Sequence, residues 1–309
     1  MTIVKYLNPK NDIAFKKIFG TEKNKDILIH FLNDVIAVPG NRNLIKTVTL
    51  LSPLQHPEIA FKKQSIVDVL CEDENGIKYI VEMQVAKVAG FEKRAQYYAA
   101  KAYASQADKG GTYEHLKEVI FLAITEYVMF PNKSDYKSEH VLLDQKTHER
   151  DLKDFSFTFL ELPKFDKIDV KDLKTYEEKW CYFFKHAHEA ESVEELIRNS
   201  GEVIHKAYQE LEAHNWTNEE LNAYEDAEKT AKDNRARESF VKNEGIQEGR
   251  EQGMEEGMRR GMEKGVEKGI KLVAKKLLSQ KLDIRVISQV TGLSVSEVEE
   301  IKKEKANLH

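Results

Sequence analysis

The sequence has few of the residues that mark extracellular, membrane or thiolate-metal proteins. Its only cysteines, Cys71 and Cys181, form no paired metal motif and favour a reducing compartment. No apolar run is long enough to span a bilayer. Lys5, Lys10 and Asp12 interrupt the segment where a signal peptide would need an apolar core. We therefore expect a cytoplasmic protein that does not enter a membrane.

Several catalytic signatures are also missing. None of the ten histidines has the spacing of a zinc site. The glycines form no phosphate-binding loop, and no arrangement of serine, cysteine and histidine indicates a nucleophile triad. Charge is what the chain has in quantity: 33% of its 309 residues are Asp, Glu, Lys or Arg, with a net charge of −5.

That charge is unevenly distributed. Residues 1–110 contain 16 Lys and Arg against 12 Asp and Glu, a net of +4, which leaves −9 for the rest of the chain. Adjacent cations suit a phosphate backbone, where they give affinity without reading sequence. Solvated surface lysines are the alternative interpretation. The adjacent pairs are Lys16-Lys17, Lys62-Lys63 and Lys93-Arg94.

The segment Gln64–Ala86 predicts a β-hairpin. Its two halves, Gln64–Glu72 and Ile77–Val85, are rich in isoleucine and valine. In the loop between them, Asp73 suits the start of a type I turn and Gly76 suits the left-handed position that closes it. We therefore predict the three-residue loop Glu74-Asn75-Gly76 rather than a two-residue turn.

The length of this loop decides which side chains meet. A three-residue loop places Asp68 directly opposite Glu82, whereas a two-residue turn would place Asp68 opposite Met83 and separate the two acids. Gln84 lies on the same face as Glu82 because side chains alternate along a strand. Two adjacent carboxylates favour a hard divalent cation, which can activate a water and stabilise charge on a phosphate. A solvated sheet face is the alternative.

The run formed by Asp68, Glu82 and Gln84, D-(13 residues)-E-x-Q, resembles the PD-(D/E)xK nuclease superfamily. In particular it is similar to the recombination-promoting nucleases and transposases of the Rpn family. The resemblance includes NDIAFKKIFG at residues 11–20 and RAQYY at residues 94–98, and covers most of the first 250 residues. It implies an α/β fold with a restriction-endonuclease-like core, a central mixed β-sheet flanked by helices, and a helical C-terminal extension.

The resemblance also implies roles for individual residues. Asp68 and Glu82 would bind Mg²⁺ or Mn²⁺, with the main-chain carbonyl of Met83 as a third ligand. Gln84 stands where most of the superfamily has lysine; it can orient the attacking water but cannot neutralise charge as an ammonium does. Val67 replaces the proline of the motif. We expect a metal-dependent DNA endonuclease linked to recombination or mobile elements. A catalytically weak or inactive DNA-binding or assembly protein on the same fold is the alternative.

Other residues near these motifs have supporting interpretations. The expected DNA contacts are Lys16, Lys17, Lys62, Lys63, Lys93 and Arg94. Either Asn11 or Asp12 caps the first helix. Asp12 would otherwise add a carboxylate to the site, but we favour the capping role. Gln96 lies near the start of the helix that borders the site in related nucleases. Tyr98 and Tyr103 have the spacing of core residues.

Apolar periodicity outlines the remaining elements. It predicts helices at Lys23–Val38 and Phe91–Asp108, preceded by a short helix with Ile13, Phe15, Ile18 and Phe19 on its apolar face, and strands at Leu44–Leu51, Val119–Thr125, His140–Leu143 and Phe155–Leu162. The pattern becomes helical from about residue 175. We therefore divide the chain into a nuclease-like domain at 1–243, a glycine-repeat segment at 244–270 and a helical tail at 271–309.

The glycine-repeat segment has a glycine at every fourth position from Gly245 to Gly269, and most are followed by an apolar residue. Each glycine costs a helix about 1 kcal/mol relative to alanine, so an isolated helix would be marginal. A flexible charged linker and a glycine-mediated dimer helix both remain open. The tail has an acidic last helix, which disfavours DNA and favours oligomerisation or regulation.

Overall fold

The computed structural model describes residues 5–36, 44–55, 65–107, 112–187, 194, 196–198 and 200–306. The chain forms two units, Met1–Asp233 and Asn234–His309. Each unit is described by itself.

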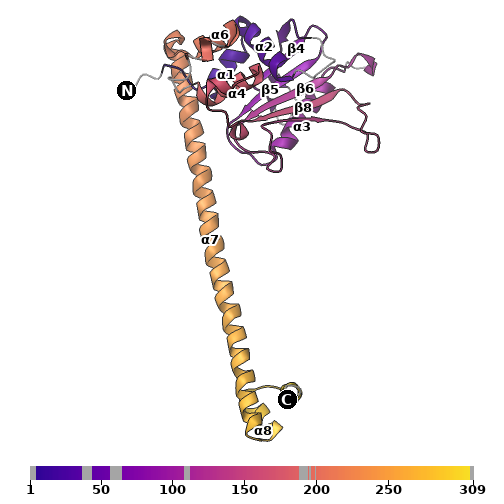
Figure 1. Cartoon of the computed structure of the whole chain (residues 1–309), viewed down its shortest axis with the longest axis vertical. Helices are drawn as coiled ribbons and strands as arrows, with labels where there is room; N and C mark the ends of the chain where they lie inside the picture. The colour runs from indigo at the N-terminus through magenta and orange to yellow at the C-terminus, as the bar shows by residue number, and fades with distance from the viewer. Residues whose placement is uncertain are drawn as a thin grey trace. The chain divides into compact units, whose positions relative to one another are not determined.

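A six-stranded mixed sheet forms the centre of the first unit (Figure 1). Three of its strands, β5, β6 and β8, run parallel to one another, while the outer neighbours pair antiparallel. In spatial order the strands are β1 (Val48–Leu50), β4 (Val69–Asp73), β5 (Lys78–Gln84), β6 (Val119–Thr125), β8 (Phe155–Glu161) and β7 (Lys137–Val141). Two short strands, β2 (Leu54–Gln55) and β3 (Ser65–Ile66), pair separately.

Helices cover both faces of this sheet (Figure 1). On one face lie α1 (Asp12–Phe19), α2 (Lys25–Ile36), α4 (Tyr176–His186) and α6 (Gly201–Leu211); on the other lies α3 (Phe91–Ala104). Strand β6 is buried along its whole length because its two faces serve two cores. Ile120, Leu122 and Ile124 pack toward the larger helical layer, and Val119, Phe121 and Ala123 pack toward α3.

Short 3₁₀ helices connect several of these elements. They are η1 (Glu22–Asn24), η2 (Tyr113–His115), η3 (Leu162–Lys164), η4 (Val170–Asp172) and η5 (Ala213–Asn215).

The first helix is fixed by a cap and an aromatic cluster. Asn11 is its N-cap, and its side chain accepts a hydrogen bond from the main-chain N–H of Ile13. Asp12 is therefore the first residue inside the helix rather than the cap that we favoured. Phe15 and Phe19 pack against Phe184 of α4, with ring centroids 6.2 and 5.9 Å away. This packing holds α1 against the sheet beside the hairpin.

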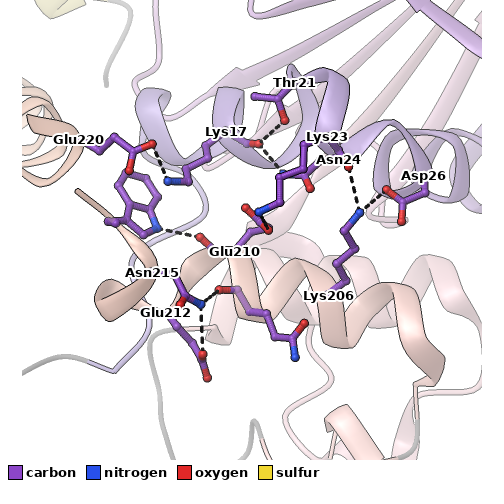
Figure 2. Close-up of polar contacts among 12 residues, drawn as sticks. Lys17, Thr21, Lys23, Asn24, Asp26, Lys206, Glu210, Glu212, Asn215 and Glu220 are labelled. Carbon is purple, nitrogen blue, oxygen red and sulfur yellow. Dashed lines mark hydrogen bonds and ion pairs between the residues drawn. The ribbon is translucent and has the colours of Figure 1, made fainter.

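Ion pairs and amide contacts join α1 and α2 to α6 and to the start of α7 (Asn218–Ser279), as Figure 2 shows. Lys23 lies 2.6 Å from Glu210, and Lys206 lies 2.6 Å from Asp26. The indole N–H of Trp216 donates to the carbonyl of Glu210. These contacts link segments almost 200 residues apart in the sequence.

The strands follow the predicted pattern with informative differences. Strand β6 has the predicted bounds. The strand expected at Gln64–Glu72 is broken into β3 and β4, because Val67 and Asp68 leave the ladder. The strand expected at Leu44–Leu51 pairs only over β1. The one expected at His140–Leu143 lies earlier, in β7, where it pairs with β8. The α/β core with a mixed sheet flanked by helices is confirmed.

In the second unit the glycine repeat is helical throughout, since Gly245–Gly269 lies within α7. The unit's small core joins the end of α7 to α8 (Ile284–Thr291) and α9 (Val295–Ala306) through Ala274, Ile287, Val298 and Ile301. Among the described residues, no helix combines the length and apolar character needed to cross a membrane.

Candidate active site

The hairpin that carries the site has the predicted register. Strand β4 pairs with β5 so that Val69 faces Val81 and Leu70 faces Ile80, which brings Asp68 opposite Glu82. The three-residue loop is confirmed: the N–H of Gly76 donates to the Asp73 carbonyl at 3.0 Å. Gly76 has φ +81°, a left-handed conformation that residues with a side chain rarely adopt.

The carboxylate of Asp73 stabilises this turn. Its Oδ1 accepts hydrogen bonds from the main-chain N–H groups of Asn75 and Ile77, at 2.8 and 2.9 Å. Its Oδ2 accepts one from the hydroxyl of Tyr79 at 3.1 Å. The buried Asp73 is therefore an acid of the turn and not of the site.

At the open end of the hairpin, Asp68 and Glu82 bind each other's strands. Asp68 Oδ2 accepts a hydrogen bond of 2.8 Å from the main-chain N–H of Met83. Glu82 Oε1 accepts one of 3.3 Å from the main-chain N–H of Asp68. Side chains thus replace the ladder where β4 begins, which explains the break before Val69. The two carboxylates are held side by side by the backbone.

Their position raises the pKa of both carboxyl groups. Glu82 is only 5% exposed, and burial, reinforced by the neighbouring Asp68 charge, raises its pKa to about 8. Burial raises the pKa of Asp68 to about 6, although the hydrogen bond from Met83 opposes this. A cation between the two groups would favour their charged forms.

Helix α1 adds an acid and a base to one side of the pair. Lys16 Nζ lies 2.7 Å from Asp12 Oδ1 and 3.8 Å from Asp68 Oδ1. The Asp12 charge raises the pKa of Asp68, while the Lys16 charge lowers it. Lys16 therefore lies between Asp12 and Asp68. The supporting role of Asp12 stays a prediction.

Helix α3 approaches from the other side through Arg94. Its Nη2 donates a hydrogen bond to Oε1 of Gln84, and Gln84 Nε2 donates to the Ala86 carbonyl at 2.7 Å. The guanidinium carbon lies 4.8 Å from the ring centroid of Phe91 and 5.9 Å from that of Tyr98. Gln84 is thus tied at both ends of its amide.

The remaining predicted residues lie in different surroundings. Lys17 Nζ is 2.6 Å from Glu220 and 4.3 Å from the ring centroid of Trp216 (Figure 2), so its charge is used within the fold. Lys93 is exposed. Gln96 is also exposed and donates to the Glu92 carbonyl on its own helix, which gives no contact with the carboxylates. Lys62 and Lys63 fall outside the described residues.

The comparison with protein families identifies the family of the chain. The model of a family described as PD-(D/E)XK nuclease family transposase matches residues 9–239. The chain belongs to this family. The match spans the six-stranded sheet, the hairpin and helices α1 to α6, so the resemblance expected from the motifs is confirmed. The comparison with curated proteins gave no match. The comparison with solved structures gave none either.

Nucleases of the PD-(D/E)XK family generally use divalent metal ions, and the donor set here fits one. Asp68 and Glu82 supply two hard oxygen ligands whose raised pKa values a cation would reverse. Within the described part of the chain, no group of three or more His, Cys, Asp and Glu side chains could hold a metal. The Met83 carbonyl, water and phosphate oxygens would therefore complete the shell, as they commonly do for Mg²⁺.

Two tyrosines near the site were not expected there. Tyr98 is only partly buried in the core beneath α3, and its ring centroid lies 5.9 Å from the guanidinium carbon of Arg94. Burial raises its pKa. Burial raises the pKa of Tyr127 to about 12, and its buried hydroxyl has no hydrogen-bond partner among the described residues. Tyr98 lies one helical turn after Arg94, a spacing visible in the sequence. No local pattern marks Tyr127.

Proposed function

We propose that this member of the PD-(D/E)XK family is a metal-dependent DNA endonuclease that hydrolyses phosphodiester bonds. Asp68 and Glu82 hold Mg²⁺ or Mn²⁺, with the Met83 carbonyl as a third ligand. The observation that supports this is the pair of reciprocal hydrogen bonds that fixes two buried, mutually repelling carboxylates on adjacent strands. Two buried carboxylates that repel each other serve stability poorly, whereas adjacent carboxylate oxygens are the ligands that a divalent cation binds.

When bound, the ion supplies Lewis acidity and a more acidic water. Residues of the chain position the metal ligands and attract the DNA. The hydrogen bond from Met83 keeps one Asp68 oxygen in place, so that Oδ1 remains for the ion. Helix α1 brings Lys16 to within 3.8 Å of Asp68, where its ammonium would attract the DNA backbone. Lys93 extends this positive surface along α3.

A catalytically weak DNA-binding or assembly protein is the second candidate. The observation that favours it is Gln84 at the lysine position, since an amide carries no charge. Cleavage linked to recombination or mobile elements fits the transposase in the family's description. The free, buried Cys71 and Cys181 fit a reducing compartment, and we place the activity in the cytoplasm.

The deciding experiment is relaxation of supercoiled plasmid DNA in Mg²⁺. Wild type should nick the plasmid, EDTA should stop it, and Asp68→Asn should lose activity by 100-fold or more without a lower melting temperature. Asp73→Asn is the matched control, because Asp73 is also a buried hairpin acid but lies at the turn. Equal nicking by wild type and Asp68→Asn, or none by wild type, would leave the binding protein.

We further propose that a second copy of the chain pairs with the glycine repeat. All seven glycines have open space where a Cβ would stand, and the apolar residues beside them are exposed: Ile246, Met254, Met258, Met262 and Val266. Residues 244–256 hold five acids and one base, whereas residues 257–271 hold five bases and two acids. An antiparallel pair would set each acidic half against a basic half, so we propose antiparallel pairing.

A further inference from the structure

We propose that Arg94 supplies the positive charge that the motif lysine would otherwise bring to the scissile phosphate, and that Gln84 is its positioning residue. This inference rests on the proposed endonuclease function. It assigns to Arg94 a catalytic contact rather than general attraction of DNA.

The first observation is the contact between the two side chains. Gln84 occupies the lysine position of the motif, and its Oε1 accepts a hydrogen bond from Arg94 Nη2. Its Nε2 is held by the Ala86 carbonyl at 2.7 Å, which fixes the orientation of the amide. The guanidinium therefore lies at the end of the side chain whose place a lysine would take. Because both ends of the Gln84 amide are engaged, Gln84 positions Arg94 rather than the attacking water.

The second observation is that the guanidinium is held by aromatic rings. The guanidinium carbon lies 4.8 Å from the centroid of Phe91, which is 98% buried, and 5.9 Å from that of Tyr98. Arginine stacks on ring faces through its planar, delocalised cation. A group held in this way loses little freedom when it binds an anion, which is the condition for stabilising charge in a transition state.

The third observation is that the guanidinium is short of acceptors. It has five N–H donors. Among the described residues it makes one hydrogen bond, to neutral Gln84, and no ion pair with a carboxylate. Its Nε is buried without an acceptor. Its charge nevertheless lowers the pKa of Glu82, so it acts on the site. A planar fork without an acidic partner suits a phosphate, which can accept two parallel hydrogen bonds.

Lys16, the other cation at the site, fits this role less well. Its ammonium is already engaged by Asp12 at 2.7 Å and lies 3.8 Å from Asp68. It therefore neutralises the acids that would hold the metal, and a bound divalent cation would repel it. Arg94 instead donates to the side-chain amide of Gln84, two residues after Glu82 on the strand, and forms no ion pair with an acid in the described part of the chain.

The chemistry assigned to Arg94 is purely electrostatic. Hydrolysis consumes one water: its oxygen bonds to phosphorus as the bond from phosphorus to the leaving sugar oxygen breaks. One proton of that water ends on the sugar oxygen, and the other leaves with the phosphate or passes to solvent. Arginine stays protonated throughout this cycle. Arg94 thus offsets the charge on the phosphate oxygens without exchanging a proton.

The test combines loss with rescue. Arg94→Met should lower the rate of Mg²⁺-dependent nicking by 100-fold or more, the size of effect seen when a charge-stabilising donor is removed. Gln84→Lys in the Arg94→Met background should recover at least 10-fold of that loss, because a lysine from β5 can reach the vacated position. Lys46→Met, which removes an exposed cation beside the turn at the other end of the hairpin, should change the rate by less than 3-fold.

A second readout does not depend on cleavage. DNA affinity is measured over a range of salt with Ca²⁺ in place of Mg²⁺. Arg94→Met should reduce the slope of log affinity against log salt by about 1, as expected for one lost phosphate contact. Arg94→Gln, which keeps a donor for Gln84 without the charge, replaces Arg94→Met if the latter does not fold.

Different results would overturn the endonuclease function and the role of Arg94. If wild type does not nick, or nicks equally with Asp68→Asn, the endonuclease function fails, and an unchanged salt slope in Arg94→Met would then overturn the phosphate contact as well. If wild type is active and depends on Asp68, two results would overturn the role of Arg94 alone. One is activity of Arg94→Met within 3-fold of wild type; the other is a double variant no faster than Arg94→Met.

Discussion

The carboxylate of Asp68 accepts a hydrogen bond of 2.8 Å from the main-chain N–H of Met83, one residue beyond the acid that faces it. With the bond from the Asp68 N–H to Glu82, this contact fixes the two acids through the hairpin itself. The positions of the two carboxylates therefore do not depend on a bound ion. The cost of this arrangement is burial, which raises the pKa of both groups; the Asp12 charge adds to the rise for Asp68, and the Asp68 charge adds to the rise for Glu82.

This cost gives the metal-free protein a specific pH dependence. Burial and the Asp68 charge raise the pKa of Glu82 from its ordinary 4.5 to about 8. A raised pKa favours the protonated native state, so the stabilisation is complete below pH 4.5 and is lost as the pH rises to about 8. We expect the free energy of unfolding in EDTA to fall over this range by a few kcal/mol, as measured by urea denaturation.

The variant Glu82→Gln isolates this effect. Its amide oxygen keeps the acceptor for the Asp68 N–H, while the titrating group is gone. Glu82→Gln should show a flatter profile than wild type and higher stability at pH 8 in EDTA. Adding Mg²⁺ at pH 8 should stabilise wild type more than the variant. Parallel profiles for the two proteins would show that the Glu82 carboxyl does not titrate in this range.

The adjacent cations of the sequence are expected to separate into structural and DNA-binding residues. Lys17→Met removes the ion pair with Glu220 and the contact with Trp216, which should lower stability by about 1 kcal/mol. Its DNA affinity and salt slope should match those of wild type. Lys93→Met is the opposite case: Lys93 is exposed, so its loss should reduce the salt slope by about 1 and leave the melting temperature unchanged.

Melting curves and salt titrations of the two variants check this division. A reduced salt slope in Lys17→Met at wild-type stability would return Lys17 to the DNA surface that the sequence predicts.

The sequence predicts those parts of the site that are determined by residues close together in the chain, and not those determined by the packing of distant elements. The register of Asp68 and Glu82 follows from a local rule, because Asp73 and Gly76 specify the loop and the loop specifies the pairing. The sequence does not predict the break at Asp68. The apolar pattern continues through Val67, and only the side-chain bonds to the opposite strand show that the ladder stops there.

The contacts that the sequence does not predict depend on packing. Arg94 meets Gln84 only because α3 lies against the sheet at one angle, although the residues are ten positions apart. Lys17 finds Glu220 across 203 positions, through the docking of α6 and the start of α7. Neither contact produces a periodic pattern in the sequence. The sequence therefore predicts the fold and the acidic pair, but it does not predict the contacts of the cations around them.

A buried indole in the helical layer gives a further prediction. Trp180 is fully buried, and its Nε1 donates to Asp34 Oδ2 at 2.8 Å. Burial raises the pKa of Asp34, and this hydrogen bond opposes the rise. Trp180→Phe should therefore cost about 2 to 4 kcal/mol, from lost packing and from a carboxylate left without its donor.

A double-mutant cycle with Asp34→Ala separates the two causes. If the hydrogen bond contributes, Asp34→Ala should be less destabilising in the Trp180→Phe background than in wild type, by about 1 kcal/mol or more. Additive losses in urea denaturation would assign the whole effect of Trp180→Phe to packing.

The charge pattern of the glycine repeat predicts both association and its direction. A helix with seven glycines carries a cost of about 7 kcal/mol relative to alanine. The i,i+4 ion pairs along the repeat, such as Arg259 with Glu263 and Arg260 with Glu256, offset only a small part of that cost. Close approach of a second helix would bury the exposed methionines where the glycines leave room. Truncation before Glu244 should therefore lower the mass in solution from that of a dimer to that of a monomer.

Charge reversal then reports the direction of pairing. In an antiparallel pair, Lys264→Glu with Lys268→Glu sets acids against the acidic half of the partner, so the dimer should dissociate at least 10-fold more readily in low salt. Adding Glu248→Lys and Glu251→Lys should restore it. In a parallel pair the basic half faces its own kind, and the first two substitutions would relieve repulsion and tighten the dimer. Sedimentation equilibrium distinguishes these results, and a monomeric wild type would reject pairing altogether.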